Sequence, residues 1–341
     1  MLFAGRGNRN AGDWLYTVGF GQSLMAGSRG FLPQYGRDHG VGVLSPLTVG
    51  EVFYFDETAN DVVDYRFPTP LAEEAPAYAE EPTFSFGHEM ARLNPGQRRV
   101  VFNCAVGGTS YSGLAKGTAP YTSWVDNLTA FVAWADARGE TVEVEWALFM
   151  HGTTDAGTFG DYVADFAQWR SDIIGDAQLI TGQVSGPKFM IDQIGWGALG
   201  SAVDSAGVWY MTEEQLAIVD AHADVWMRGP RYNCDAWFPD TLHGDGMFYW
   251  DIGSVMADIA TEIEGGADWE PLRPTAATAN GNTVVLDFDV PVTPVVLSSE
   301  LPAPLSGLGT QEYENEPNYG FQYYDDGVAA IESVAVTGPS S

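Results

Sequence analysis

The stretch Trp14-Leu-Tyr-Thr-Val-Gly-Phe-Gly-Gln-Ser-Leu-Met-Ala-Gly27 decides the fold. Residues 14–18 are β-branched, aromatic or aliphatic, a pattern that is typical of a buried strand. Gly19 and Gly21 follow, and glycine allows the backbone to turn sharply or to approach another group closely. We therefore expect a strand that leads into a turn with Ser23 at its tip. In a parallel α/β sheet, functional sites form at the carboxyl ends of the strands, where this turn would lie.

Three other interpretations of the turn can be compared with the sequence. A plain βα turn, in which Ser23 only caps a helix, stays open on these residues alone. A dinucleotide fingerprint would need a third glycine where Leu24 stands. A lipase-type nucleophile elbow would need a glycine where Met25 stands. A nucleophilic Ser23 would therefore need a different set of partner residues.

Candidate partners lie near the other end of the chain, in Phe238-Pro-Asp-Thr-Leu-His-Gly244. Asp240 precedes His243 by three residues, so one loop can bring its carboxylate to one ring nitrogen of the histidine. The other ring nitrogen can then accept a proton from a serine hydroxyl. This spacing is common in surface loops, and it gains weight only together with the early Gly-Gln-Ser.

Four short blocks in order resemble the SGNH hydrolases, in the branch of sialate O-acetylesterases and acetylxylan esterases. The first block of that branch, G-Q-S-N-M, is Gly21–Met25 here, and the second, G-G-T-S, is Gly107–Ser110. The third, H-Q-G-E-x-D, corresponds to Met150–Asp155. The fourth is the pair Asp240 and His243. The blocks span roughly residues 14–265.

The resemblance implies a serine esterase that removes acetyl or another small acyl group from a carbohydrate. Ser23 would be the nucleophile, His243 the base, and Asp240 the residue that orients the base. The backbone N–H groups of Ser23 and Gly108 would hold the oxyanion. The substrate would be an acetylated oligosaccharide or polysaccharide, and neither a cofactor nor a metal is expected. Gln22 and Thr109 are the expected substrate-binding residues.

The chain departs from the family pattern at Leu24, His151 and Thr153. His151 stands where relatives carry a glutamine that donates a third hydrogen bond to the oxyanion, and a neutral histidine can also donate one. A purely structural histidine bonded to the loop is the alternative. Thr153 replaces an acid, which puts any role of that acid in doubt. We expect Asp155 to hold the loop rather than to take part in chemistry.

Two rival functions stay open, and these departures favour the first of them. The first is a carbohydrate-binding or structural virion module on a hydrolase fold that has lost its activity. The second is a lipid or thioester hydrolase on the same fold. Turnover of a chromogenic acetate ester separates the first rival from an esterase, and a series of acyl chain lengths separates the second.

Composition limits the partners. The 341 residues carry 46 acidic and 15 basic side chains, for a formal net charge of −31. Such a chain should repel nucleic acid and anionic membrane surfaces, so neither is an expected partner. Hydrophobic residues make up 45% of the chain, which suffices for a packed core.

The termini and cysteines suggest where the chain works. The first ten residues lack a charged segment followed by an apolar run, so we expect no signal peptide. No stretch approaches the apolar length that spans a bilayer. We expect a soluble chain, either cytoplasmic or carried outside a cell in a virus particle. For Cys104 and Cys234, one disulfide and two buried thiols are both open, and we favour the thiols.

Alternating strand and helix signals predict a parallel sheet with helices on both faces. Together with the family resemblance, this predicts an α/β flavodoxin-like three-layer sandwich for residues 1–268. After the first strand, residues 28–80 read as a long insertion with little regular structure and one strand at 52–55. Further strands are expected at 100–104, 142–150 and 189–191. Helices are expected at 83–93, 124–138, 159–173, 212–223 and 248–263, the fourth opened by a capping box at Thr212.

The pattern changes near Pro271 to strands without helices. Strand signals at 282–292, 320–324 and 330–336 predict a small all-β module over residues 269–341. An isolated sandwich has about seven strands, so this module would be incomplete. We expect it to pack on the esterase domain or on other virion or cell-surface chains.

Overall fold

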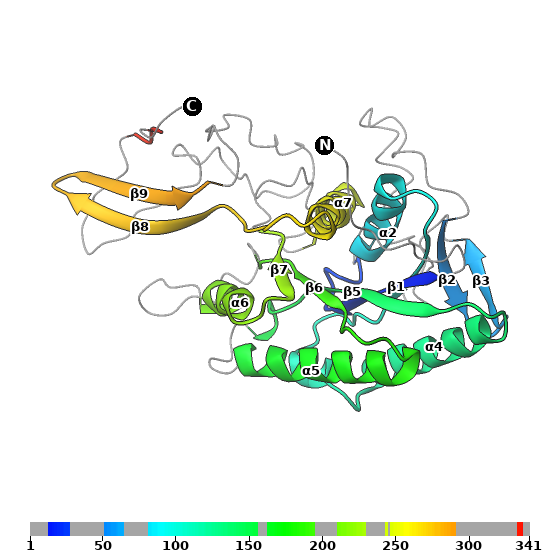
Figure 1. Cartoon of the computed structure of the whole chain (residues 1–341). Coiled ribbons are helices and arrows are strands. Elements are labelled where there is room, and N and C mark those ends of the chain that lie inside the picture. Colours follow the sequence, from blue (N-terminus) through cyan, green and yellow to red (C-terminus); the bar gives the residue numbers. More distant parts are fainter. Residues whose placement is uncertain are drawn as a thin grey trace, which may run out of the picture.

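The computed structural model describes residues 13–27, 51–64, 81–155, 162–194, 210–229, 243–244, 246–290 and 333–336. Asp240, Cys234 and the strand expected at 320–324 lie outside these ranges. The described residues form one large α/β unit and a two-stranded hairpin that extends from it (Figure 1).

A seven-stranded sheet forms the middle layer, in the order β3-β2-β4-β1-β5-β6-β7. Its strands are β1 (Trp14–Gly21), β2 (Val52–Asp56), β3 (Asp61–Asp64), β4 (Arg98–Asn103), β5 (Val142–Met150), β6 (Lys188–Ile191) and β7 (Val225–Met227). All neighbouring pairs are parallel except β2 with β3. Without the β2–β3 hairpin, the order is the flavodoxin-like 2-1-3-4-5, which confirms the expected fold class.

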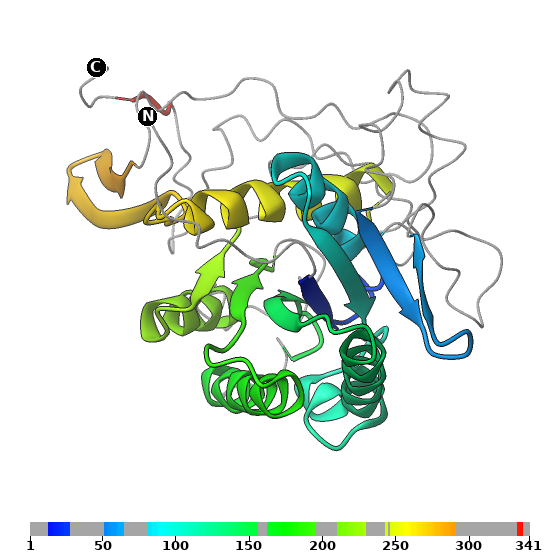
Figure 2. The same ribbon diagram turned by 45° about the vertical axis from the view of Figure 1, so that its right-hand side comes forward.

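Helices cover both faces of the sheet, as Figures 1 and 2 show. One face carries α2 (Pro82–Leu93) and α7 (Gly246–Glu264), which lie side by side. The other face carries α4 (Ala119–Asp136), α5 (Tyr162–Thr181) and α6 (Tyr210–Ala221). A single turn, α3 (Tyr111–Leu114), follows the loop after β4. The site edge of the sheet is set by β1, which lies between β4 and β5.

Strand β5 shows why the sheet is buried on both sides. Trp146, Leu148 and Met150 point into the core beneath α2 and α7, whereas Ala147 and Phe149 point into the core beneath α4 and α5. Successive side chains of a strand face opposite sides. A central strand covered by helices on both faces therefore reads as a continuous apolar run.

An aromatic cluster fixes the carboxyl end of β1, just before the Ser23 turn. The ring of Phe20 is fully buried and lies 5.5 Å from Trp124, 5.5 Å from Phe149 and 5.3 Å from Trp169, measured between ring centroids. Each such pair contributes about 0.5–1.5 kcal/mol beyond the burial of its area. The strand that leads into the Ser23 turn is thus anchored by a buried aromatic cluster.

A glycine lets α7 approach α2 closely. A Cβ atom at Gly253 would overlap Ser85 Oγ and the carbonyl oxygen of Pro82, both on α2. The Ser85 hydroxyl bridges the two helices by a 3.2 Å contact with the carbonyl oxygen of Tyr249. This tight crossing fixes the position of α7 and, with it, that of His243, which lies three residues before the helix begins.

Several sequence predictions need correction. The segment at 51–64 is an ordered hairpin that widens the sheet, with a turn in which Asn60 has a φ of 50°. Helix α6 begins at Tyr210, so Thr212 lies inside the helix and cannot be its N-cap. Helix α4 begins five residues earlier than expected, and α5 continues to Thr181. Strand β7 was not predicted.

The strands predicted for the carboxyl-terminal residues also need correction. β8 (Arg273–Asn280) was not predicted, and it pairs antiparallel with β9 (Thr283–Asp289), which was. Residues 333–336 have no regular structure, so that part of the strand expected at 330–336 is wrong. The hairpin exposes Val284, Val285 and Leu286. The division into domains at residue 268 stays a prediction.

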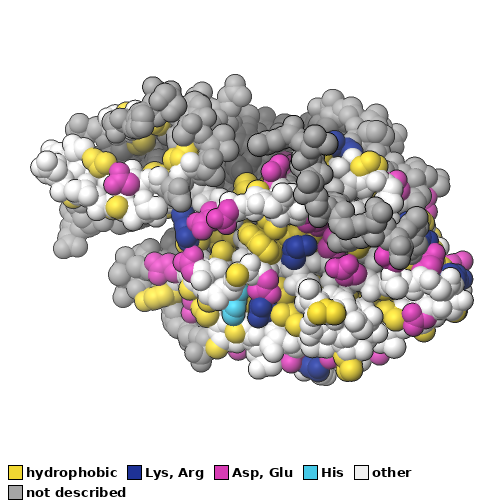
Figure 3. All heavy atoms as spheres, viewed as in Figure 1, with side chains coloured by type: hydrophobic (Ala, Val, Ile, Leu, Met, Phe, Trp, Pro, Cys, Tyr) yellow, Lys and Arg dark blue, Asp and Glu magenta, His cyan; other side chains and the backbone are white. Residues whose placement is uncertain are grey.

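Acidic side chains are spread over the face seen in Figure 3 rather than gathered in one patch. Several form ion pairs, such as Arg170 with Asp224 and Lys116 with Asp176 at 2.7 Å. Within the described ranges, no helix is long and apolar enough to cross a bilayer.

Candidate active site

The candidate nucleophile and base are in contact. His243 Nε2 lies 2.8 Å from Ser23 Oγ, although the two residues are 220 positions apart in the chain. Ser23 is 8% exposed, in the turn directly after β1. A histidine nitrogen at hydrogen-bond distance from a serine hydroxyl is the arrangement that activates the hydroxyl for nucleophilic attack.

Two backbone donors face the same region. A Cβ atom placed on Gly107 would lie 3.8 Å from Ser23 Cβ, so the loop after β4 packs against the nucleophile. Gly108 has a φ of 63°, which L residues with side chains rarely adopt. No atom of the described residues lies within 4 Å of the position that a Cβ atom would take there. Among the described residues, the N–H groups of Ser23 and Gly108 donate to no protein acceptor. They are therefore available to a substrate oxygen.

His151 is buried and bonded at both ring nitrogens. Its Nδ1 lies 3.0 Å from the hydroxyl of Tyr162 and its Nε2 lies 3.1 Å from the carbonyl oxygen of Thr109. A carbonyl only accepts, so Nε2 carries the proton and Nδ1 accepts from the tyrosine. Burial lowers the pKa of His151 to about 4, so the ring is neutral at pH 7.

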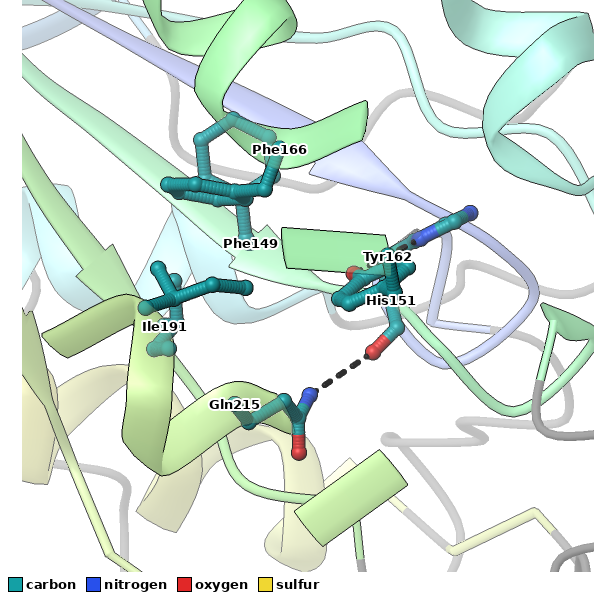
Figure 4. A pocket seen from close by; sticks show the side chains of 7 residues that line it. Phe149, His151, Tyr162, Phe166, Ile191 and Gln215 are labelled. Atoms are coloured by element: carbon teal, nitrogen blue, oxygen red, sulfur yellow. Dashed lines mark hydrogen bonds between the residues drawn. The ribbon is translucent and has the colours of Figure 1, made fainter. Parts of the chain in front are cut away.

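The surroundings of His151 are packed rather than open. Figure 4 shows the side chains around it, and the amide of Gln215 donates to the backbone oxygen of His151 at 3.1 Å. The lining residues are Phe149, His151, Tyr162, Phe166, Ile191, Gln215 and Ile218, and they leave no room for a water-sized molecule. This pocket belongs to the core and is not a substrate site.

Hydrogen bonds tie the three loops of the site together. Thr154 donates from its backbone N–H and from its hydroxyl to Gln22 Oε1, each at 3.1 Å. The Asp155 carboxylate accepts from the N–H of Tyr111 at 3.2 Å. With the bond from His151 to Thr109, the loop after β5 holds both the Ser23 turn and the Gly107–Gly108 loop.

Comparison with known proteins bears on the fold. No profile of a known protein family and no curated protein matches the sequence. A solved structure of protein AT4G34215 from Arabidopsis thaliana matches with a TM-score of 0.52 at 15% identity, over 74% of this chain and 98% of its own. XAC1771, a carbohydrate acetylesterase from Xanthomonas citri, matches with a TM-score of 0.50 at 15% identity, over 81% of this chain and 62% of its own.

The chain shares the α/β fold of these two structures. In this fold, the first, second and third sequence blocks fall on the loops after β1, β4 and β5, which are neighbours in the sheet. Identity of 15% establishes the architecture alone, so the chemistry has to be argued from the site itself.

The fold brings most of the expected site residues together. Ser23, Gln22, Gly108, Thr109 and His151 all lie on the three neighbouring loops, and His243 reaches Ser23 from the start of α7. Asp240 lies outside the described residues, so its contact with His243 stays a prediction. Asp155 holds a loop in place, as expected.

The oxyanion role expected of His151 is not favoured by its contacts. Both nitrogens are used by Tyr162 and Thr109, so His151 would have to release Thr109 before it could donate to a substrate. The sequence reasoning missed Thr154 and Tyr162, the two residues that tie Gln22 and His151 into the network. Neither has a spacing signal that could have found it.

One other potential nucleophile lies close by. Cys104, at the end of β4, is a buried free thiol 3.1 Å from the carbonyl oxygen of Gly19. Burial raises the pKa of this thiol well above its ordinary value, so it stays protonated and weakly nucleophilic. In the described part of the chain, no three acidic, histidine or cysteine side chains gather as metal ligands.

Proposed function

We propose that this chain is a serine esterase that removes acetyl or another small acyl group from a carbohydrate. The observation that carries the proposal is the 2.8 Å contact between Ser23 Oγ and His243 Nε2. Beside it lie the N–H groups of Ser23 and Gly108, which donate to no acceptor in the described part of the chain. These are the nucleophile, the base and the oxyanion donors that acyl transfer needs. The structural likeness to a carbohydrate acetylesterase supports the choice of substrate class.

In the first half of the reaction, Ser23 Oγ attacks the ester carbonyl as His243 Nε2 takes the hydroxyl proton. The carbonyl oxygen becomes an oxyanion held by the two N–H groups. As the intermediate collapses, the bond from carbon to the sugar oxygen breaks, and the histidine gives its proton to that oxygen. The free sugar hydroxyl leaves, and the acyl group stays on Ser23.

In the second half, His243 removes a proton from a water molecule, which attacks the acyl-serine. The new oxyanion collapses with cleavage of the bond to Ser23 Oγ, and the histidine returns the proton to the serine. Acetic acid leaves, and the free enzyme is restored. Asp240, in our proposal, holds the second ring nitrogen of His243 through both halves.

Acetate release from acetylated xylan oligosaccharides and from O-acetylated sialic acid tests the proposal. We expect turnover by the wild-type chain and its loss in Ser23→Ala and in His243→Ala, both with wild-type unfolding behaviour. Ser185→Ala and His222→Ala are matched controls, because Ser185 is exposed, His222 is partly exposed, and both lie away from the site edge. They should keep full activity.

The same assay judges the rival functions. A folded wild-type chain that binds these glycans but releases no acetate would support a binding or structural module instead. A series of 4-nitrophenyl esters tests the acyl group, and we expect turnover to fall as the chain lengthens beyond acetate. Preference for long acyl chains would support a lipid hydrolase.

A further inference from the structure

The side-chain amide of Gln22 has a fixed orientation. Gln22 lies between the end of β1 and Ser23 and is 2% exposed. One end of its amide faces the backbone N–H of Thr154 at 3.1 Å. A backbone N–H can only donate, so that end is the carbonyl oxygen Oε1, and the Thr154 hydroxyl also donates to it. The Nε2 amino group must therefore point away from Thr154.

Among the described residues, the amino group of Gln22 is a donor without a protein partner. It donates to no acceptor within the described ranges, and it keeps contact with solvent although the residue is almost fully buried. The amide is therefore held by two hydrogen bonds at its oxygen, while its amino group stays open to solvent. A bound ligand at the site edge is the partner that this arrangement fits.

The location of the amide matches the missing oxyanion donor. Gln22 is on the loop after β1 and is bonded to Thr154 on the loop after β5, so its amide lies at the boundary between these neighbouring strands. The family resemblance implies a third oxyanion donor on the loop after β5. In this chain, His151 on that loop has committed its single N–H to Thr109. The Thr154 hydroxyl proton is used as well, by Gln22 Oε1.

We propose that Gln22 Nε2 donates the third hydrogen bond to the oxyanion and that Thr154 is the residue that positions it. The inference rests on the proposed esterase function. As the carbonyl oxygen of the ester gains negative charge, Nε2–H donates to it alongside the N–H groups of Ser23 and Gly108. Thr154 holds Oε1, so the amide cannot turn its oxygen toward the developing charge.

Two substitutions of Gln22 remove the donor in different ways. Gln22→Glu keeps an oxygen for Thr154 and the shape of the side chain, whereas Gln22→Met removes the donor without adding charge. Loss of one oxyanion donor lowers kcat by about 10²–10³-fold. We expect a decrease of that order in both variants, with KM changed by less than about threefold, because the hydrogen bond strengthens only as charge develops.

The positioning role of Thr154 has its own readout. Thr154→Val keeps the backbone donor and removes the hydroxyl, so we expect a smaller decrease in kcat than in the Gln22 variants, with KM unchanged. Thr154→Ser restores the hydroxyl and should recover wild-type kcat. Affinity for a boronic acid, which forms a tetrahedral adduct on the serine, should fall in parallel with kcat.

A matched control separates catalysis from stability. Gln183 also uses its amide to hold β5, through Val144, but at the amino end of the strand. Gln183→Met should lower the free energy of unfolding and leave kcat and the boronic acid affinity at wild-type values. If Gln22→Met behaves like Gln183→Met in this comparison, the inference is wrong.

The outcomes distinguish this inference from the proposed function. If Ser23→Ala abolishes turnover while both Gln22 variants keep wild-type kcat, the oxyanion role of Gln22 is wrong and the esterase stands. A raised KM with unchanged kcat would also overturn it, because Gln22 would then bind the substrate equally before and during reaction. Full turnover in Ser23→Ala would overturn both.

Discussion

Acid should destabilise this protein through His151. In the folded chain, burial lowers the pKa of His151 to about 4, against 6.5 for an exposed histidine. Above pH 6.5 the ring is neutral in both states and adds no pH dependence. As pH falls below 6.5, the unfolded chain binds a proton that the folded chain excludes, so the stability that His151 provides is lost progressively down to about pH 4.

The size of this effect follows from the two pKa values. Each pH unit between them corresponds to about 1.36 kcal/mol. Between pH 7.5 and pH 5, the His151 contribution to the free energy of unfolding should therefore fall by about 2 kcal/mol. Many carboxylates also titrate toward acid, so the total change in the wild-type chain does not isolate the histidine.

A comparison with His151→Gln isolates the contribution of His151 to the pH dependence of stability. Glutamine can donate to the Thr109 carbonyl and accept from the Tyr162 hydroxyl, but it does not titrate. Urea unfolding of both proteins from pH 7.5 to pH 5 gives the difference in free energy, in which the distant carboxylates cancel. The Asp155 carboxylate lies 3.4 Å from His151 Nε2, so its titration can couple to that of the histidine. Both unfolding measurements should therefore be repeated with Asp155→Asn added to the wild-type and to the His151→Gln chain.

Between pH 7.5 and pH 5, we expect the free energy of unfolding to fall by about 2 kcal/mol more in the wild-type chain than in His151→Gln. A difference that stays flat from pH 7.5 to pH 5 would refute the reasoning, because His151 would then not be a buried neutral group. His151→Ala tests the oxyanion role separately, because alanine has no donor. If His151 holds only the loop, this variant should mainly lower the melting temperature and leave kcat near the wild-type value.

Three further predictions follow from the site, the charge and the hairpin. Because a nucleophile and its base act as a unit, the Ser23→Ala/His243→Ala double variant should release acetate scarcely more slowly than either single variant. Asp240→Asn should lose less activity than either. If the double variant's decrease in rate were instead the product of the two single decreases, that would argue against a triad. Because the chain has a net charge of −31, its acidic side chains repel one another. The melting temperature should therefore rise with NaCl up to about 0.1 M, where charges more than about 10 Å apart become screened. An unchanged melting temperature would mean that the acidic side chains are locally compensated. Residues 271–341 expressed alone should show no cooperative melt as a monomer, and calorimetry that finds one would disprove the incomplete module.

The sequence predicts the buried elements well, because their apolar pattern is dictated by burial. β1, β5 and α7 are each covered on the faces that the pattern marks. β3, β7 and β8 were missed because they are short or exposed. The pairing of β3 and β8 also depends on turns such as the one at Asn60.

The sequence also predicts only part of the candidate site. The contact between Ser23 and His243 was predicted only through the family blocks, since no local pattern joins residues that are 220 positions apart. The bonds from Thr154 to Gln22 and from Tyr162 to His151 depend on the paths of two loops, and nothing in their residue types reveals the partner. For His151, the sequence shows neither its burial nor its bonds to Tyr162 and Thr109, and its oxyanion role stays a prediction.

Identifying the residue that becomes acylated tests the central claim most directly. An alkyl fluorophosphonate reacts with an activated serine and stays attached, so peptide mass spectrometry can locate the adduct. We expect one adduct per chain, on Ser23, with labelling slowed severely in His243→Ala and absent from Ser23→Ala. An adduct on another side chain, or acetate release by a chain whose Ser23 cannot be labelled, would contradict the account.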